Sequence, residues 1–517
     1  MELRTSVYVI ATVFLLYAVL MLVIGGITYR KTSDISDFFL GGRNLNPWVG
    51  ALSAQASDMS GWLLMGLPGL AYLSTGGMVE AVWTAFGLLI GTLLNWIIIA
   101  RRFRRYTEIA DNSITLPDYF SNRFHSKKSV LRMIAALFIL IFFILYTAAQ
   151  FNAGAKLFTV VFPGLSYKTA LLIGSIIIIG YTFLGGFLAV CWTDFIQGIL
   201  MFCALILVPI FAFRSMDTAQ LSAFMSEFSA IIPGKGGESI ETLTIVSAIA
   251  WGLGYFGMPH ILTRFMGMKT SKEIKPATVI AMVWVVFSLA AGTLVGWLGR
   301  YIMPGLDAVD SEKIFMGMSD RFFPPIMVGI LLTAILAAIM SSADSMLLVA
   351  SSAFSKDLYK NNIRKTAGEK ELMWASRITV LVVALIAIVL ASDEASTVFS
   401  LVSYAWAGFG SAFGPAILLS LYWKRMTGKG ALAGVVSGGL VSLFWTYKAT
   451  GLFGIPWLFK FEFMQGGLYD MYAIIPGFAV SLICIVVFSL LDKKPDAKIE
   501  GEFKLAASHE LLPSERG

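Results

Sequence analysis

The sequence predicts an all-α integral membrane protein with thirteen transmembrane helices, on three observations. The chain of 517 residues is 57% hydrophobic and only 14% charged, with a mean hydropathy of +0.78, whereas soluble domains average about 25% charged residues. Apolar runs long enough to cross a hydrocarbon core roughly 30 Å thick recur from end to end. Two of these runs are interrupted by polar residues, glycine and proline.

The expected spans leave no room for a large soluble domain. The first has an apolar core too long for a signal peptide and is followed by YRK in place of a small-residue cleavage site, so we expect a retained helix. In chain order the expected spans are residues 6–28, 46–72, 78–100, 133–155, 169–190, 194–213, 241–262, 278–299, 325–350, 378–392, 396–423, 431–447 and 472–491.

Lysine and arginine are distributed unequally between the two sets of loops. All of them map to loops or to span edges, and 29 of the 39 fall in one set. Because cytoplasmic loops carry an excess of these residues, we expect the N-terminus outside and the C-terminus inside. This topology accounts for the net charge of +7, and a nucleic acid is not expected as a partner.

Cysteine and histidine are scarce. The three cysteines lie within or beside spans and show no CxxC spacing, and only three histidines exist. The chain therefore has too few suitably spaced cysteines and histidines for a disulfide framework, a zinc site or a Ser-His-Asp catalytic triad. We expect a protein that is not an enzyme.

Two spans combine glycine, proline and polar residues near their middle. Residues 46–72 contain SAQASDMSGWLLMGLPG, and residues 241–262 contain AWGLGYFGMPH. They are five spans apart, so they cross the membrane in opposite directions. Interrupted helices at matching positions of two inverted halves indicate a transporter with a site at the bilayer midplane, where irregular backbone is tolerated because it lines a cavity.

Asp58 stands 12 residues into the first interrupted span. A carboxylate at a helix centre costs at least about 2.5 to 3.5 kcal/mol on insertion scales, so it needs a partner, a proton, a cation or water. If the helix breaks here, Asp58 can cap the second half-helix. The positive end of that half-helix would attract an anionic group, and the freed carbonyls would attract a cation. A carboxylate that only pairs inside the bundle is the alternative.

Two further acids lie in or beside span interiors. Asp194 opens its span from the inner side, where an ion would leave towards the cytoplasm. Asp344 lies among Ser341, Ser342 and Ser345, and the first and last of these serines share a helix face. Hydroxyl and carbonyl oxygens are hard ligands suited to Na⁺. Serine hydroxyls that bond their own helix backbone are an equally good interpretation of these residues.

An aromatic stripe marks the second interrupted span. Trp251, Tyr255 and Pro259 are spaced four apart and share a face. Such a stripe is ordinarily packing, but glycines open the backbone beside it, which favours the lining of a pocket. Tyr146, near mid-depth of its span, could supply a hydroxyl to the same cavity.

Five long motifs in order carry a resemblance. DMSGWLLMGLPG, YTFLGGFLAVCWTDFIQG, WGLGYFGMPHILTRFM, AILAAIMSSADSMLLVASSA and SYAWAGFGSAFGP resemble the bacterial sodium/proline symporters of the solute:sodium symporter family. The similarity runs from LGGR at 40–43 to the last span. It implies a LeuT-type core of two inverted repeats of five helices. The implied division is residues 1–45 for an extra helix and inner loop, 46–213 and 214–423 for the repeats, 424–491 for two further helices, and 492–517 for a cytoplasmic tail.

The resemblance also implies a site. Asp58 falls on the aspartate important for sodium-coupled binding, and Asp194 falls on the one near the inner ion path. Asp344 is a third candidate for ion coupling; it has an uncharged counterpart in some relatives, which leaves open a second cation or proton site. The implied Na⁺ ligands are the backbone carbonyls of Ala56, Met59 and Ala338 and the hydroxyls of Ser341 and Ser342. The implied proline pocket comprises Ser60, Trp62, Tyr146, Trp251, Tyr255 and Pro259.

These features together predict sodium-coupled uptake of L-proline by alternating access across a bacterial cytoplasmic membrane. Na⁺ is the co-transported ion, no organic cofactor is expected, and the expected partners are L-proline, Na⁺ and the lipid bilayer. The alternatives are another small carboxylate or a betaine-like osmolyte as substrate, or a transporter-like sensor. A sensor is disfavoured because only about 25 residues follow the last expected span. The sequence leaves the oligomeric state open.

Overall fold

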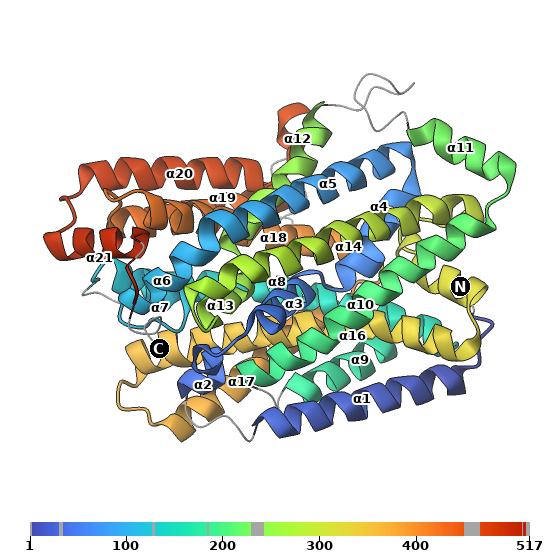
Figure 1. Ribbon diagram of the computed structural model, residues 1–517, viewed down its shortest axis with the longest axis horizontal. Coiled ribbons are helices and arrows are strands. Elements are labelled where there is room, and N and C mark those ends of the chain that lie inside the picture. Colours follow the sequence, from blue (N-terminus) through green and yellow to red (C-terminus); the bar gives the residue numbers. More distant parts are fainter. Residues whose placement is uncertain are drawn as a thin grey trace.

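The protein is a bundle of long helices that lie side by side (Figure 1). The computed structural model describes residues 3–29, 35–126, 130–182, 186–228, 242–448, 466–508 and 510–512. Within these ranges every regular element is helical, apart from one isolated bridge between Leu45 and Met268. The all-helical fold class is therefore confirmed.

The helices of the first half include several that are short. Their bounds are α1 Val7–Tyr29, α2 Ile35–Leu40, α3 Pro47–Asp58, α4 Leu67–Leu73, α5 Thr75–Leu94, α6 Arg101–Ile109, α7 Leu116–Arg123, α8 Val130–Val161, α9 Tyr167–Thr182, α10 Phe187–Ser215 and α11 Thr218–Phe228.

The helices of the second half include α16, most of whose residues are buried. Their bounds are α12 Thr242–Ala250, α13 Pro259–Gly267, α14 Ile274–Ile302, α15 Ile314–Phe322, α16 Pro325–Ser352, α17 Glu369–Leu390, α18 Val398–Tyr422, α19 Gly428–Tyr447, α20 Ile474–Leu491 and α21 Ala497–Ala507.

Ten described helices are long and apolar enough to cross a membrane, or eleven if one bent pair is counted as a span. The two remaining expected spans are helical as well. Residues 46–72 are divided between α3 and α4, and α9 has only 16 residues in the span expected at 169–190. The chain thus has the helices of a multi-pass membrane protein, and the count of thirteen stays a prediction.

Both expected interruptions are present. α3 ends at Asp58 because Met59 leaves the helical backbone, with φ −79° and ψ 67°. The chain then re-enters a helix through a π-helical turn that begins at Trp62 and leads into α4. On the second segment, a 3₁₀ turn follows α12, and Met258 with φ −79° and ψ 107° precedes α13, giving a bend of 45°.

Lys156 and Arg264 are among the cationic side chains that are buried, although the sequence placed them at span edges. Lys156 lies in α8 and Arg264 in α13, and both helices extend several residues beyond the expected spans. This extra length brings the two side chains inside the bundle. The Lys156 Nζ forms an ion pair of 2.6 Å with Glu312 Oε2, and each side chain is only 2% exposed.

Candidate functional site

A small cavity lies where the two interruptions meet. It is bounded by both broken segments together with α5, α8 and α18. Its free space is about 10 Å³, which holds roughly one water molecule. The lining residues are Asp58, Met59, Trp62, Leu88, Tyr146, Trp251, Tyr255, Val402 and Trp406.

Asp58 is the only carboxylate among these lining residues, and two tyrosines hold it. The Tyr255 hydroxyl donates a hydrogen bond of 2.7 Å to Asp58 Oδ2. The Tyr146 hydroxyl donates one of 3.2 Å to the Asp58 backbone carbonyl. Asp58 therefore joins the first break to the second break and to α8.

The second half of the first broken helix is capped by other residues than Asp58. The Trp62 N–H donates to Ser60 Oγ at 3.2 Å, and the Gly61 N–H donates to Gln150 Oε1 at 3.4 Å. The turn at Met59 places Ser60 at the start of the new helix. The expected capping role of Asp58 is thus filled by Ser60 and Gln150.

Aromatic rings form one wall of the cavity. Trp251 stacks on Trp62 with ring centroids 5.9 Å apart, and on Tyr472 at 5.1 Å. Phe399 lies 5.0 Å from Trp251. The Trp406 ring meets Tyr255 edge-on at 5.1 Å.

The sequence reasoning missed three aromatic residues of this region. Trp406 of α18 lines the cavity, whereas Phe399 of α18 and Tyr472, which precedes α20, pack on Trp251 without lining it. The segment SYAWAGFGSAFGP carried a usable signal, because its small residues allow close approach and its tryptophan needs a hydrogen-bond acceptor. The Trp406 Nε1–H donates to the Trp251 carbonyl at 2.7 Å. Of the expected pocket residues, Ser60 and Pro259 are buried and do not line the cavity.

Gly254 makes the contact between α18 and the second break possible. A Cβ at this position would overlap the Trp406 indole. We predict that Gly254→Ala lowers the free energy of unfolding by about 1–3 kcal/mol, the usual cost of overpacking. The measurement is denaturant titration of the purified protein in detergent. Gly180→Ala on α9 is the control, because a Cβ there meets nothing within 4 Å, and equal effects of the two changes would contradict the prediction.

Oxygen atoms converge beside the cavity, between α3 and α16. The Ser341 hydroxyl donates to the Ala56 carbonyl at 2.8 Å and to the Ala338 carbonyl at 3.1 Å. Ser342 Oγ is buried with no hydrogen-bond partner among the described residues. The structure thus brings three of the expected Na⁺ ligands into contact, namely Ala56, Ala338 and Ser341. The fourth, Ser342, is the next residue of α16, and its hydroxyl oxygen is free to accept a cation. Met59 lies at the break itself. This set of hard oxygens suits a small cation.

A buried ion pair lies further along α3. The Arg264 Nη2–H donates to Asp194 Oδ2 at 3.0 Å, and the Ser53 hydroxyl donates to the same oxygen at 2.7 Å. Arg264 also donates to Ser53 Oγ at 3.1 Å and to Ser345 Oγ at 2.5 Å. Arg264 therefore connects α3, α10, α13 and α16. The sequence reasoning missed it because it lies two residues beyond an expected span.

Asp344 shares this region and is fully buried. The Ser345 hydroxyl donates to Asp344 Oδ1 at 3.4 Å. Asp344 Oδ2 and Asp194 Oδ1 have no hydrogen-bond partner within the described ranges. Two carboxylates with free lone pairs thus lie near a single guanidinium.

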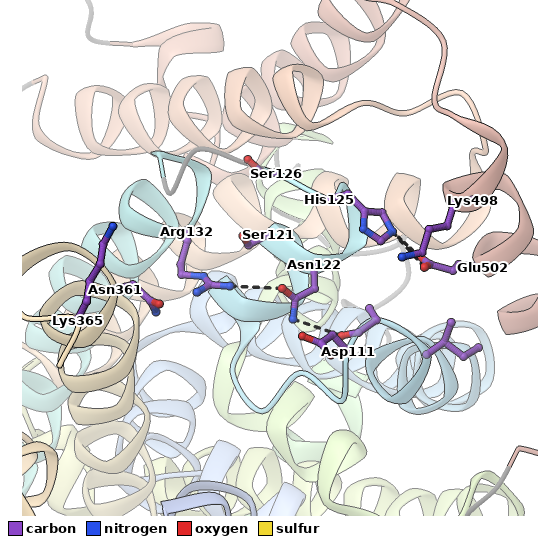
Figure 2. Close-up of a pocket in the computed structure, with 12 residues that line it drawn as sticks. Asp111, Ser121, Asn122, His125, Ser126, Arg132, Asn361, Lys365, Lys498 and Glu502 are labelled. Carbon is purple, nitrogen blue, oxygen red and sulfur yellow. Dashed lines mark hydrogen bonds and ion pairs between the residues drawn. The ribbon is translucent and has the colours of Figure 1, made fainter. Parts of the chain in front are cut away.

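A second pocket opens at the end of the bundle where α7, α8 and α21 meet (Figure 2). Its volume is about 830 Å³. His125 Nε2 lies 2.9 Å from Glu502 on α21, and the Phe503 ring is flanked by Arg102 at 4.7 Å and Arg123 at 5.6 Å. Arg132 donates to Asn122 at 3.4 Å. This pocket shares no lining residue with the central cavity.

Broken helices that meet around a buried cavity, with hard oxygens at the break, define the class of secondary transporters. Residues 38–438 match the model of the sodium:solute symporter family. The chain belongs to this family. As the family is one of transporters, the expectation that the chain is not an enzyme is confirmed.

Relatives match over nearly the whole chain. The chain is 46% identical over 508 residues to a sodium/proline symporter of Salmonella typhimurium, which covers 96% of each chain. It is also 46% identical over 487 residues to an osmoregulated proline transporter of Bacillus subtilis, covering 93% of this chain and 94% of the relative. A substrate-bound, outward-open Na⁺-coupled sialic acid symporter superposes with a TM-score of 0.72 at 18% identity, over 94% of this chain and 99% of that one. The last match establishes the fold.

Proposed function

We propose that the protein is a sodium-coupled symporter that carries L-proline into the cell. The observation that carries this proposal is the first break, where residues 56–60 contact both the oxygen cluster around Ser341 and the aromatic cavity around Tyr255. One short segment can therefore respond to an ion and to a solute. The names of the two relatives with 46% identity support proline as the solute.

Coupling follows from this shared segment. The proposed Na⁺ ligands are Ala56, Met59, Ala338, Ser341 and Ser342. Na⁺ at these oxygens would hold α3 against α16 and fix the backbone beside Asp58, so ion and proline would stabilise each other by the same factor. Inward movement of one charge at roughly 100 mV supplies about 2.3 kcal/mol, before the concentration gradient is added.

The proposed proline pocket is centred on the central cavity. Its proposed residues are Ser60, Trp62, Tyr146, Trp251, Tyr255 and Pro259, of which Ser60 and Pro259 are buried without lining the cavity, and the structure leads us to add the lining residue Trp406. Aromatic walls suit the apolar ring of proline, and hydroxyls suit its charged ends. Asp58 would link this pocket to the ion, and Asp194 would lie on the inner ion path. Asp344, with an oxygen that has no partner among the described residues, could belong to a second cation or proton site.

The proposed architecture is a LeuT-type core with one helix before it and two after it. It has thirteen spans, with repeats at 46–213 and 214–423, flanked by 1–45, 424–491 and the tail from 492, whose residues 513–517 lie outside the described ranges. The start of α1 and the helix α21 lie at opposite ends of the bundle (Figure 1). This arrangement supports an odd number of spans, with the N-terminus outside and the C-terminus inside a bacterial cytoplasmic membrane.

A betaine-like osmolyte is the second candidate substrate, and the aromatic wall favours it. A quaternary ammonium group is attracted to the faces of tryptophan and tyrosine rings, and Trp62, Trp251 and Trp406 surround the cavity.

Uptake of labelled L-proline into proteoliposomes tests the proposal. We expect accumulation driven by an inward Na⁺ gradient, which disappears when choline replaces Na⁺. Unlabelled proline should compete, and glycine betaine should not. Equal uptake in choline would contradict sodium coupling, and stronger competition by the betaine would favour the second candidate.

Asp58→Asn is expected to weaken the apparent affinity for Na⁺ about tenfold to a hundredfold, because it weakens a charge-assisted hydrogen bond at the shared break. The measurement is the Na⁺ concentration that gives half-maximal proline uptake. Asp470→Asn, in an exposed outer position, is the control. An unchanged Na⁺ dependence would show that Asp58 has a structural role only.

A further inference from the structure

An apolar groove lies on the outer surface of the bundle, between α3, α10 and α14. Its volume is about 430 Å³, and only apolar atoms are exposed in it. Several of its side chains face outwards, among them Trp48 with 59% and Val279 with 62% of the residue exposed. The lining residues are Trp48, Leu52, Ile199, Phe202, Val279, Ile280, Val283 and Trp284.

The floor of the groove is close to the proposed ion site. Gly198 of α10 packs against α3 so closely that a Cβ on it would lie 3.4 Å from the Ala56 Cβ. The Trp284 Nε1–H donates to the Gly198 carbonyl at 2.9 Å and closes the floor. Leu52 on the groove wall is one helical turn from Ala56. A molecule in the groove would therefore press on the segment of α3 that leads to the break.

Two lysine side chains lie at one end of the groove. Lys275, Val279 and Val283 are four residues apart, so they form one row along a face of α14. Lys272 lies one turn earlier, and both lysines are exposed. Neither forms a salt bridge to any residue in the described part of the chain. By the distribution of lysine and arginine, this end of α14 faces the cytoplasm.

We propose that this groove binds one acyl chain of an anionic phospholipid of the cytoplasmic leaflet, with the phosphate at Lys272 and Lys275. The apolar wall matches the acyl chain, and the two ammonium groups at its end match the headgroup charge. The bound lipid lies between α3 and the helices α10 and α14 that pack on it. It therefore stabilises one position of α3 relative to these two helices. This inference concerns a surface separate from the central cavity and is independent of the identity of the transported solute.

Native mass spectrometry of the full chain in detergent tests the proposal, with phosphatidylglycerol and phosphatidylcholine of identical acyl chains as probes. We expect phosphatidylglycerol to be retained preferentially. Lys272→Gln/Lys275→Gln should weaken its binding about thirtyfold, since each basic residue at an anionic leaflet contributes roughly fivefold. Val283→Trp should fill the groove and reduce retention of both lipids.

Two control variants separate a specific site from general lipid contact. Lys493→Gln/Lys494→Gln removes the same charge from another exposed cytoplasmic position, and Val382→Trp enlarges a half-exposed residue on α17. Both should bind phosphatidylglycerol as the wild type does. Equal retention of the two lipids, or equal effects of test and control variants, would overturn the proposal. A changed oligomeric state of Val283→Trp with unaltered lipid binding would assign the groove to a second copy of the chain and would overturn it as well.

Discussion

Replacing Arg264 with glutamine is expected to lower the free energy of unfolding by about 3–5 kcal/mol, because it leaves a carboxylate buried without its cation. Asp194 and Arg264 are both fully buried and lie 3.0 Å apart. Besides the guanidinium, the Asp194 oxygens have only the Ser53 hydroxyl as a donor among the described residues. The loss should also loosen α13 from α3, α10 and α16, which Arg264 joins.

Titration of purified protein with SDS from mixed micelles measures this effect. Arg214→Gln is the control, since Arg214 is exposed at the end of α10. The double variant Arg264→Gln/Asp194→Asn should recover much of the stability, because the unpaired charge is removed together with its partner. If Arg264→Gln behaves like the control, Asp194 needs no cation, and the interpretation of this pair as a stabilising contact is wrong.

Glu312→Gln is expected to have an effect of similar size, about 3–5 kcal/mol, because Lys156 would then be the unpaired buried charge. Glu312 Oε2 accepts hydrogen bonds from Lys156 Nζ at 2.6 Å and from the Val398 N–H at 3.0 Å, and Glu312 Oε1 accepts one from the Phe399 N–H at 3.1 Å. The carboxylate thus also caps the N-terminus of α18. Since Phe399 packs on Trp251, proline uptake should fall together with stability.

The same titration, combined with uptake assays, separates these two consequences. Glu394→Gln is the matched control, because Glu394 is exposed in the loop before α18. Glu312→Gln/Lys156→Met should restore stability, because it removes the buried unpaired charge. It should not restore uptake, because the carboxylate that caps α18 is still missing. Full uptake by the single variant would contradict a link between this cap and the aromatic wall.

The positions of the helix breaks could be predicted from the sequence, because their causes are local. Asp58, Ser60 and Gly61 interrupt one apolar run, and the glycines before Pro259 interrupt the other. Each of these residues weakens a helix by its own chemistry, whatever it contacts later. The sequence also predicted that Asp58, Tyr146 and Tyr255 lie around one cavity, because both breaks and Tyr146 lie near the middle of their spans.

The partners of these residues could not be predicted, because they are distant in the chain. Arg264 is 70 residues from Asp194 and 81 from Ser345, and Trp406 is 155 residues from the Trp251 carbonyl that it bonds. Such pairings depend on how α13 and α18 pack, and a periodicity within one helix carries no information about them. For the same reason the cap at Gly61, supplied by Gln150 of α8, replaced the one expected from Asp58.

The small volume of the central cavity has a consequence for equilibrium binding. Space for about one water molecule means that a proline-sized solute binds only to molecules whose walls have moved apart. The measured affinity is then the intrinsic affinity multiplied by the populated fraction of that wider form, so a fraction of about one in a hundred weakens it about a hundredfold. Trimming a wall side chain can therefore strengthen proline binding even though it removes a contact.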